Sequence, residues 1–267
     1  MSKCRCLICD FDGTVASSDR TISKGNLKAI KGFIERGGIF VLCTGRMTPS
    51  IEKILRSNNL DCLLASFNGA VLTNLKTGEV LYSHKIDNKT VIKAFTLFNK
   101  LNLNAHCYDN ETFIAQENSK TLETYTMLNG VQPKVVKSIL NHVIETGLDS
   151  GKLLVFEDKE VCDKHFEEVK NTLSELEVVR SNDHHIDINV LGKNKGFACE
   201  FISKYFNIPL SEIIGVGDNG NDEPMFKKVG LPIVMGNGLD SLKAKYKTVA
   251  PDNDSDAIKY IIENYCI

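Results

Sequence analysis

The chain has 267 residues, of which 42% are hydrophobic and 25% are charged. This composition is ordinary for a soluble globular protein, and the length is sufficient for two domains and a large core. A formal net charge of −2, with the lysines scattered along the chain, argues against a nucleic-acid partner. We see neither an 18-residue apolar stretch nor a secretory leader, so we expect a cytoplasmic protein without a membrane partner.

The nine cysteines fit a reducing compartment, because most of them lie inside apolar runs, as buried thiols do. Cys4, Cys6 and Cys9 have a C-x-C-x-x-C spacing that resembles a set of thiolate metal ligands. No matching cysteine or histidine group follows at a finger-like distance, and in an extended strand Cys9 would point away from the other two. We therefore interpret these thiols as structural.

The first predicted strand, residues 4–9, ends in the run Asp10-Phe11-Asp12-Gly13-Thr14. Side chains alternate along a strand, so Asp10 and Asp12 are expected to point the same way, and Gly13 lets the chain turn. Two carboxylates in one small space raise each other's proton affinity unless a cation lies between them. The run therefore predicts bound Mg²⁺ or a proton shared by the carboxylates, although a turn that merely caps a strand uses the same residue types.

A helix after Ser23 is predicted next, because apolar side chains between residues 27 and 34 share one face and Gly37-Gly38 can end it. The second predicted strand, residues 39–43, ends in Thr44-Gly45-Arg46. Asn68 lies at the end of another strand, although Asn-Gly is also a common pair in turns. These strands thus end in polar, glycine-containing sequence.

The pattern changes after Ala70, where two short apolar stretches around Lys76-Thr77-Gly78 predict a hairpin. A segment that mixes helical and strand-like patterns follows. It has predicted helices near residues 91–101 and 161–173, and predicted strands at residues 153–156 and 178–179. We interpret it as an inserted α+β domain, from which the chain returns near residues 186–191.

Lys195-Gly196 opens a segment with helical periodicity over residues 197–206, where a lysine and the free N–H groups of a helix start could bind an anion. A strand over residues 213–216 then ends in the run Gly217-Asp218-Asn219-Gly220-Asn221-Asp222. A strand at residues 231–235 and a closing helix at residues 257–265 complete the pattern.

Apolar runs that alternate with helical patterns are typical of βαβ units and a parallel sheet, which makes the expected fold class α/β. In an open parallel sheet, ligands bind beyond the carboxyl ends of the strands. The polar runs after residues 9, 43 and 216, together with Lys195, are therefore expected to form one site.

In these motifs the chain resembles the haloacid dehalogenase superfamily, and within it the Cof-type phosphatases that carry a type IIB cap. The run at residues 10–14 resembles motif I, with Asp10 as the nucleophile and Asp12 as the general acid and base. The remaining motifs, in order, are similar to the motif II hydroxyl at Thr44, the motif III lysine at Lys195 and motif IV at residues 217–222.

The resemblance covers nearly the whole chain, including the runs Asn68-Gly69-Ala70 and Met235-Gly236-Asn237, but it weakens between about residues 84 and 185. A second lysine, Lys193, lies two positions before Lys195. We prefer Lys195 as the motif III residue because glycine follows it.

The resemblance implies a Rossmann-like doubly wound parallel sheet core, the HAD fold, with an inserted α+β cap domain. The core would comprise residues 1–83 and 187–267, and the cap would comprise residues 84–186 and determine substrate specificity. Candidates for recognition of the leaving group in the cap are His106, Tyr108, Asp109 and Lys152.

The resemblance also implies roles for the site residues. The residues that would hold Mg²⁺ are Asp10, Asp12, Asp218 and Asp222, with Asp218 as a direct ligand, Asp12 acting through its backbone carbonyl and Asp222 acting through a water molecule. The residues that would bind the phosphoryl group or line the site are Thr44, Gly45, Lys195, Asn221 and Asn68.

The implied function is Mg²⁺-dependent hydrolysis of phosphomonoesters of small, sugar phosphate-like metabolites through an aspartyl-phosphate intermediate. The expected partner is a small-molecule phosphate ester, and the sequence is compatible with a monomer or a homodimer. Two alternatives remain, a phosphotransferase or mutase of the phosphomannomutase kind and a non-catalytic sensor of phosphorylated metabolites. Both would use the same pocket.

Overall fold

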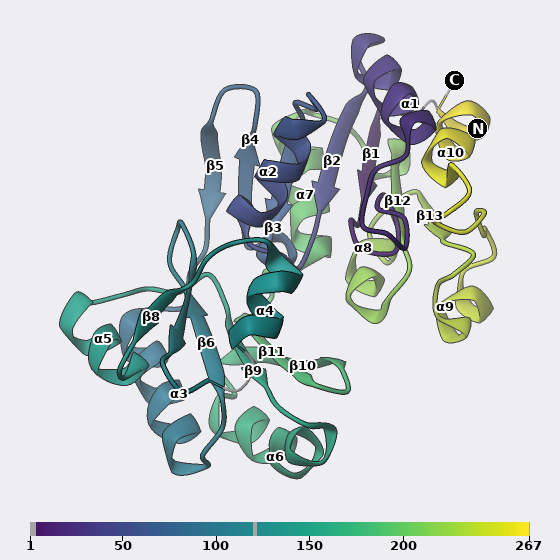
Figure 1. The fold of residues 1–267 in the computed structure, drawn as a ribbon. Coiled ribbons are helices and arrows are strands. Elements are labelled where there is room, and N and C mark those ends of the chain that lie inside the picture. The colour runs from purple at the N-terminus through teal and green to yellow at the C-terminus, as the bar shows by residue number, and fades with distance from the viewer. Residues whose placement is uncertain (1–3, 120–121, 267) are drawn as a thin grey trace. The chain divides into compact units, whose positions relative to one another are not determined.

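The computed structural model describes residues 4–119 and 122–266, which form two compact units (Figure 1). The first unit extends to Gly45, resumes over Ile54–Tyr82 and includes the chain from Lys193 onward. The second unit comprises Arg46–Lys53 and Ser83–Gly192. Apart from the short piece at Arg46–Lys53, the second unit is one continuous insertion into the first.

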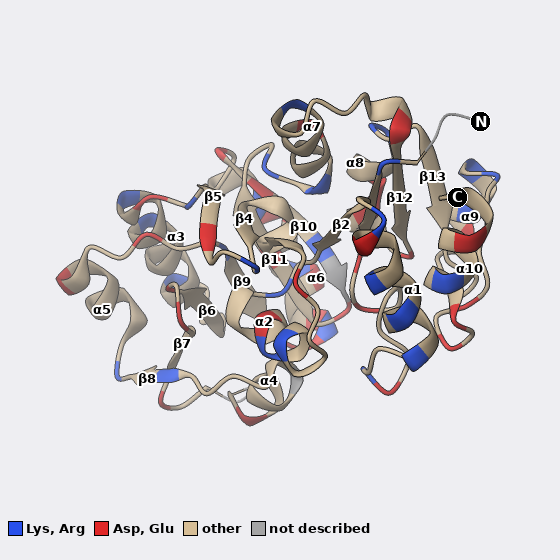
Figure 2. Cartoon of the chain, turned by 90° about the horizontal axis from the view of Figure 1, so that it is seen from above, with Lys and Arg blue, Asp and Glu red and all other residues tan. Residues whose placement is uncertain are grey.

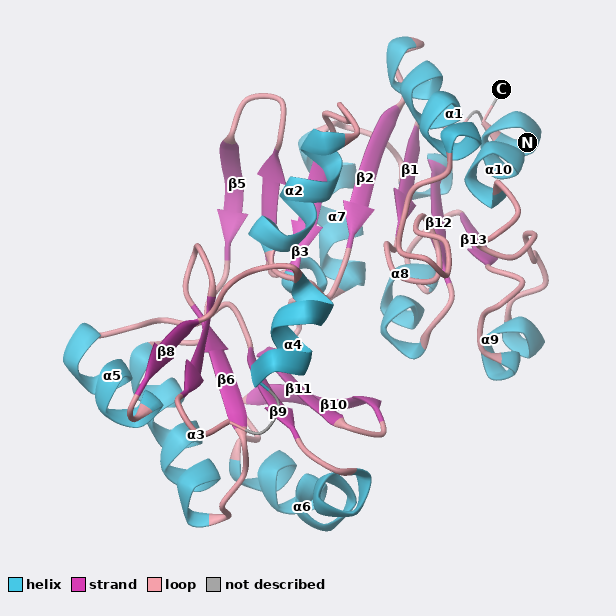
Figure 3. Ribbon diagram, viewed as in Figure 1, coloured by secondary structure: helices cyan, strands magenta, loops and turns pink. Residues whose placement is uncertain are grey.

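The first unit is built on a seven-stranded sheet with the strand order β13-β12-β1-β2-β3-β4-β5 (Figure 3). Its strands are β1 (Cys6–Cys9), β2 (Ile39–Cys43), β3 (Leu63–Ser66), β4 (Val71–Asn74), β5 (Glu79–Ser83), β12 (Ile213–Gly217) and β13 (Leu231–Val234). Neighbouring strands from β13 to β3 are parallel, whereas β4 pairs antiparallel with β3. The predicted α/β class is confirmed.

Helices cover both faces of this sheet, as a doubly wound fold requires. Seen from above, α1 and α10 lie on one side of strands β2 and β12, and α7 and α8 lie on the other (Figure 2). The helices of this unit are α1 (Lys24–Glu35), α7 (Lys195–Tyr205), α8 (Glu223–Phe226), α9 (Asp240–Lys245) and α10 (Ala257–Tyr265), with short 3₁₀ turns η1 (Phe67–Gly69), η2 (Leu210–Glu212) and η3 (Gly220–Asp222). Helix α2 (Thr48–Ser57) is divided between the two units at Ile54. Helix α1 begins as predicted, because the Ser23 hydroxyl accepts a hydrogen bond from the N–H of Asn26 at 3.0 Å.

The central strands are buried on both faces, which explains their continuous apolar sequences. Ile8 and Val41 pack with Ala198 of α7 in one core cluster. Leu7 and Leu42 are also fully buried, and because they occupy the alternate positions of the same strands they point to the opposite face.

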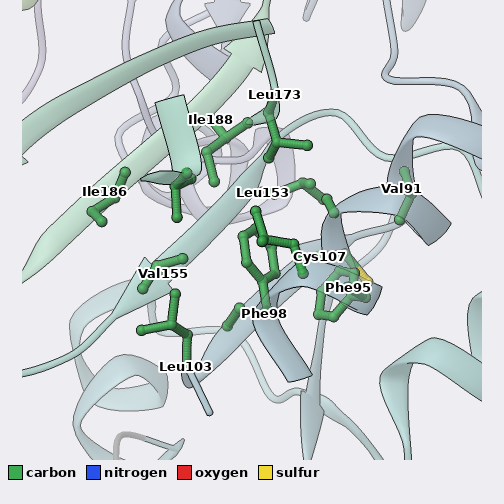
Figure 4. Close-up of a cluster of buried hydrophobic side chains, with 14 of the residues drawn as sticks. Val91, Phe95, Phe98, Leu103, Cys107, Leu153, Val155, Leu173, Ile186 and Ile188 are labelled. Carbon is green, nitrogen blue, oxygen red and sulfur yellow. The ribbon is translucent and has the colours of Figure 1, made fainter. Parts of the chain in front are cut away.

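The second unit contains a six-stranded sheet with the order β10-β11-β9-β6-β7-β8. Its strands are β6 (Ala105–Tyr108), β7 (Phe113–Gln116), β8 (Lys134–Val136), β9 (Leu153–Phe156), β10 (Leu176–Asn182) and β11 (His185–Val190), and its helices are α3 (Asn88–Lys100), α4 (Leu122–Asn129), α5 (Ile139–Thr146) and α6 (Lys159–Thr172). Alternate strand residues such as Val155 and Ile188 pack against Phe95 and Phe98 of α3 in one apolar core (Figure 4). The mixed composition of this unit is that of an α+β fold.

The return to the first unit comes later than the sequence suggested. Residues 185–190 form β11, which pairs with β9 and β10 and buries Ile186 and Ile188 in the core of the second unit. The chain therefore leaves this sheet only after Val190, and helix α7 begins at Lys195.

No helix within residues 4–119 and 122–266 is both long enough and apolar enough to cross a bilayer.

Candidate active site

The candidate active site lies at the carboxyl edge of the seven-stranded sheet, within the first unit. The parallel strands β12, β1 and β2 are neighbours, with Cys9 in register with both Val216 and Leu42. Asp10, Thr44 and Asp218 each follow the end of one of these strands. The topology therefore brings these three positions to one edge of the sheet, where ligands bind in open α/β folds.

A cluster of carboxylates occupies this edge. One oxygen each from Asp10, Asp218 and Asp222 can be chosen so that all three lie within 4.8 Å of one another. Asp10 is 5% exposed and Asp222 is fully buried, so water screens their charges little.

Lys195 supplies an ammonium to this cluster. Its Nζ donates hydrogen bonds to Oδ1 of Asp10 and to Oδ1 of Asp222, both at 2.6 Å, and the side chain is fully buried. Burial alone would disfavour the charged amine, but the carboxylates of Asp10 and Asp222 outweigh it and raise the pKa of Lys195 above its usual value. The lysine is therefore held as a cation.

The local sequence around Lys195 explains why it reaches the site. The Asn194 side chain accepts hydrogen bonds from the N–H groups of Gly196 and Phe197, which caps the first turn of α7. A Cβ at Gly196 would lie 2.5 Å from the carbonyl oxygen of Pro224, so glycine is required for α7 to approach α8. Lys193, by contrast, places its Nζ 3.7 Å from the centroid of the Phe197 ring.

Asp222 is held by hydrogen bonds at both of its oxygens. Oδ1 accepts from Lys195, and Oδ2 accepts from the backbone N–H groups of Asp218 and Asn219 at 2.9 and 3.0 Å. A Cβ at Gly217 would lie 2.2 Å from Cγ of Asp222, so only glycine leaves room for this carboxylate. The acidic run thus folds around Asp222 and directs Asp218 toward Asp10.

The carboxylates are not fully compensated by Lys195. Burial raises the pKa of Asp10 well above its usual range, and although Lys195 opposes this shift, the neighbouring carboxylates add to it. Burial, followed by the charge of Asp222, raises the pKa of Asp218 to about 6. A divalent cation bound by carboxylate oxygens would relieve this repulsion, and an all-oxygen donor set is the kind that Mg²⁺ prefers. The residues present therefore fit such an ion.

Asp12 has a different environment from the one that strand alternation suggests. Strand β1 ends at Cys9, so Asp10 to Gly13 already belong to the following turn, in which Asp12 forms an isolated bridge with Ala16. The Asp12 side chain is exposed and stands outside the carboxylate cluster. The carboxylates that raise the pKa of Asp10 are those of Asp222 and Asp218.

The remaining predicted residues lie beside one another. The Nδ2 of Asn221 donates to Oδ1 of Asn68 at 3.2 Å, and the N–H of Asn68 donates to the carbonyl of Thr44 at 2.8 Å. A Cβ at Gly45 would lie 3.0 Å from Oδ1 of Asn68, so these two positions are also close. Thr44 is fully buried, whereas Asn221 is exposed.

Three residues of the site were not predicted from the sequence. The hydroxyl of Thr14 donates to Oδ1 of Asp218 at 3.0 Å, and side chains of Asn237 and Asn253 donate to backbone carbonyls of the Asp12 turn. Thr14 could have been identified because it belongs to the run at residues 10–14, and Asn237 because it belongs to the run at residues 235–237. Asn253 stands in no motif.

The four candidates in the second unit lie in or beside strands β6 and β9. His106 and Tyr108 are buried, and Lys152 donates to Oδ1 of buried Asp187 at 2.6 Å. Neither ring nitrogen of His106 has a hydrogen-bond partner among the described residues, and burial lowers the pKa of this histidine to about 3. Asp109 holds a turn, since its Oδ1 accepts from the N–H groups of Glu111 and Thr112.

Comparison with known proteins agrees with this geometry. The model of the haloacid dehalogenase-like hydrolase family matches residues 7–262. A curated relative, the 5-amino-6-(5-phospho-D-ribitylamino)uracil phosphatase YwtE of Bacillus subtilis, is 27% identical over 97% of this chain and 97% of its own length.

Two solved structures support the fold. A haloacid dehalogenase-like hydrolase from Bacteroides thetaiotaomicron aligns with a TM-score of 0.88 at 23% identity, covering 98% of this chain and 99% of that one. The subclass IIB sugar phosphatase BT4131 aligns with a TM-score of 0.81 at 20% identity, covering 98% of each chain. The predicted resemblance is confirmed, and the chain belongs to the haloacid dehalogenase-like hydrolase family.

Proposed function

We propose that this protein is a Mg²⁺-dependent phosphatase that hydrolyses phosphomonoesters of small, sugar phosphate-like metabolites through an aspartyl-phosphate on Asp10. The observation that carries this proposal is the buried Asp10 carboxylate, which lies within 2.6 Å of the Lys195 ammonium and in one cluster with Asp218 and Asp222. A nucleophile, a fixed cation and a set of hard oxygen ligands therefore meet at the end of one strand.

The first step is attack by a carboxylate oxygen of Asp10 on phosphorus. The bond between phosphorus and the ester oxygen breaks, Asp12 gives its proton to that oxygen, and the alcohol leaves. The exposed position of Asp12 in the turn after β1 suits a group that must meet a leaving group and later water. Lys195 and the Thr44 hydroxyl would hold phosphoryl oxygens during this transfer.

The second step returns the enzyme to its starting state. Asp12, now ionised, takes a proton from a water molecule, whose oxygen attacks phosphorus and displaces the Asp10 carboxylate as inorganic phosphate forms. Microscopic reversibility makes the same residue the acid of one step and the base of the next. Asp222, with both oxygens occupied, would keep Lys195 in place throughout.

The expected ion fits the same residues. Mg²⁺ held by the carboxylates of Asp10 and Asp218, by the Asp12 backbone carbonyl and through water by Asp222 would supply the positive charge that lets an anionic nucleophile approach an anionic ester. Asn221, Asn68 and Gly45 lie next to Thr44 and would line the phosphoryl site.

We assign the leaving group to the second unit, the proposed cap, because the residues of the first unit would contact the phosphoryl group that all candidate substrates share. We also propose a cytoplasmic location, since all nine cysteines are buried free thiols and suit a reducing compartment.

A phosphate-release screen with Mg²⁺ and a panel of phosphorylated metabolites tests this proposal. The panel should include sugar phosphates and 5-amino-6-(5-phospho-D-ribitylamino)uracil, because a relative is named for that substrate. Each reaction should also be analysed for isomerised sugar phosphate, the product of a mutase. Phosphate release that requires Asp10 supports the proposal, whereas isomerisation without phosphate release, or binding without turnover, would replace it with one of the two alternatives.

A further inference from the structure

Two asparagines outside motifs I to IV hold the turn that carries Asp12. The Nδ2 of Asn237, which follows β13, donates to the carbonyl of Gly13 at 2.9 Å. The Nδ2 of Asn253 donates to the carbonyl of Ala16 at 2.9 Å, and its backbone N–H donates to Oδ1 of Asn237 at 3.0 Å. The two side chains thus form one connected set of hydrogen bonds that reaches both ends of the segment after Asp12.

This turn needs support from outside because β1 has already ended. Its internal hydrogen bonds, such as that from the N–H of Ala16 to the carbonyl of Phe11 at 2.9 Å, return to the start of the turn. Gly13 adopts a positive φ of 74°, in the region where only glycine is unstrained. The carbonyls of Gly13 and Ala16 point outward from the turn, and Asn237 and Asn253 are the side chains that satisfy them.

The segment that contains Asn237 also holds the loop of Asp218. The N–H of Met235 donates to the carbonyl of Gly217 and the N–H of Leu239 donates to the carbonyl of Asp218, each at 2.9 Å. A Cβ at Gly238 would lie 3.0 Å from the carbonyl oxygen of Asp218, so the segment runs close against that loop. One segment therefore fixes the turn of Asp12 relative to Asp218.

We propose that Asn237, supported by Asn253, is a positioning residue that places the Asp12 carboxyl for proton transfer to the leaving oxygen. This inference rests on the proposed function, in which Asp12 is the general acid. A buried asparagine such as Asn253, 7% exposed, restricts the turn more strongly than a solvated hydrogen bond does. Asp12 lies in this turn, between the ends that the two asparagines hold, so a shift of the turn would shift its carboxyl.

The proposal predicts a dependence on the leaving group. An alkyl phosphate needs its leaving oxygen protonated, whereas a nitrophenyl phosphate releases a stable anion and needs little help from an acid. Asn237→Ala should therefore lower kcat/KM for an alkyl phosphate by about 10- to 100-fold, a part of the ~10² to 10⁴ that general acid catalysis supplies. The kcat/KM for nitrophenyl phosphate should stay within a few fold. This ratio is the informative readout, because a general loosening of the fold would lower both values together.

The experiment compares kcat/KM for these two esters, with Mg²⁺ present, in the wild type and four single variants with recorded melting curves. Asp12→Asn shows how far kcat/KM for each ester falls when the general acid is lost. Asn253→Ala keeps the hydrogen bond from its backbone N–H to Asn237 and removes only the side-chain bond to Ala16. It should therefore lower kcat/KM for the alkyl phosphate more than for nitrophenyl phosphate, but less strongly than Asn237→Ala does. This variant is the test if Asn237→Ala does not fold. Asn264→Ala, which removes an exposed side-chain bond to the carbonyl of Tyr260, is the matched control and should change neither ester.

A double variant completes the test. If Asn237 acts through Asp12, then Asp12→Asn combined with Asn237→Ala should be no slower on the alkyl phosphate than Asp12→Asn alone. Additive losses, or equal losses on both esters in both asparagine variants, would overturn the inference while leaving the proposed function in place. If Asp12→Asn itself lowered kcat/KM equally for both esters, the role of Asp12 in the proposed function would fail, and this inference would fail with it.

Discussion

The ammonium of Lys195 lies 2.6 Å from a carboxylate oxygen of Asp10, although 185 positions separate the two residues in the sequence. The whole of the second unit lies between them in the sequence. Buried ion pairs of this kind add little stability compared with apolar side chains of the same size. We therefore attribute the pair to the proposed chemistry, in which Asp10 would attack phosphorus and Lys195 would bind the phosphoryl group.

Asp10→Asn should abolish turnover without unfolding the protein. The amide keeps the volume of the carboxylate but cannot attack phosphorus, so we expect phosphate release to fall by about 10³-fold or more, as for other catalytic nucleophiles. The melting temperature should not fall, because one of three crowded carboxylates has been neutralised. Phosphate release and melting curves of the purified variant measure both effects, and undiminished hydrolysis would remove Asp10 from the mechanism.

Lys195→Met should reduce both activity and stability. The substitution leaves Asp10 and Asp222 buried without their cation, which costs about 3 to 5 kcal/mol when one partner of a buried pair is removed. Lys193→Met is the matched control, since the ammonium of Lys193 lies over the Phe197 ring. Urea unfolding and phosphate release of the two variants compare the two lysines directly. Similar behaviour of the two variants would argue that Lys195 has no special role.

Removal of divalent metal should stop turnover, and Ca²⁺ should inhibit competitively with Mg²⁺. Mg²⁺ requires a compact octahedral set of oxygens, whereas Ca²⁺ accepts more ligands and can bind both oxygens of a carboxylate, which would occupy the nucleophile. Mg²⁺ should also raise the melting temperature, because it would bind the folded cluster of Asp10, Asp218 and Asp222 and not the unfolded chain. Full activity after exhaustive chelation would exclude this dependence.

The second unit should lose stability in mildly acidic solution because of His106. Its pKa is lowered to about 3 in the folded state by burial, with the charges of His185 and Lys152 adding to the effect. The unfolded chain therefore binds the proton first, so the free energy of unfolding should fall by about 1.4 kcal/mol per pH unit as the pH drops below about 6.5. His106→Phe keeps an aromatic ring and removes the titrating nitrogens. Urea unfolding followed by circular dichroism should show a shallower decline for this variant between about pH 6.5 and pH 4.5, and parallel declines would exclude His106 as the cause.

The sequence predicted the first unit well because its strands are buried on both faces and end in distinctive polar runs. The run at residues 10–14 and the run at residues 217–222 follow neighbouring parallel strands, so their proximity could be inferred before any coordinates. The alternation of side chains along a strand could not place Asp12, because β1 ends at Cys9.

The second unit was harder to predict because its elements are short. Strand β8 has three residues and helix α4 has eight, too few to establish a periodicity. His106 and Lys152 are buried, which their polar side chains alone did not indicate. Asn253 could not have been identified at all, because its side chain donates to the carbonyl of Ala16, which lies 237 positions away in the sequence.

The central claim is that Asp10 carries the phosphoryl group during turnover. The most direct measurement uses the Asp12→Asn variant, in which loss of the general base should slow hydrolysis of the intermediate, with a nitrophenyl phosphate that needs no acid to react. After rapid acid quenching and proteolysis, mass spectrometry should find one phosphoryl group on the peptide that contains Asp10, and none when Asp10 is also replaced by Asn. A phosphoryl group on another residue, or one that persists in the Asp10→Asn background, would contradict the account.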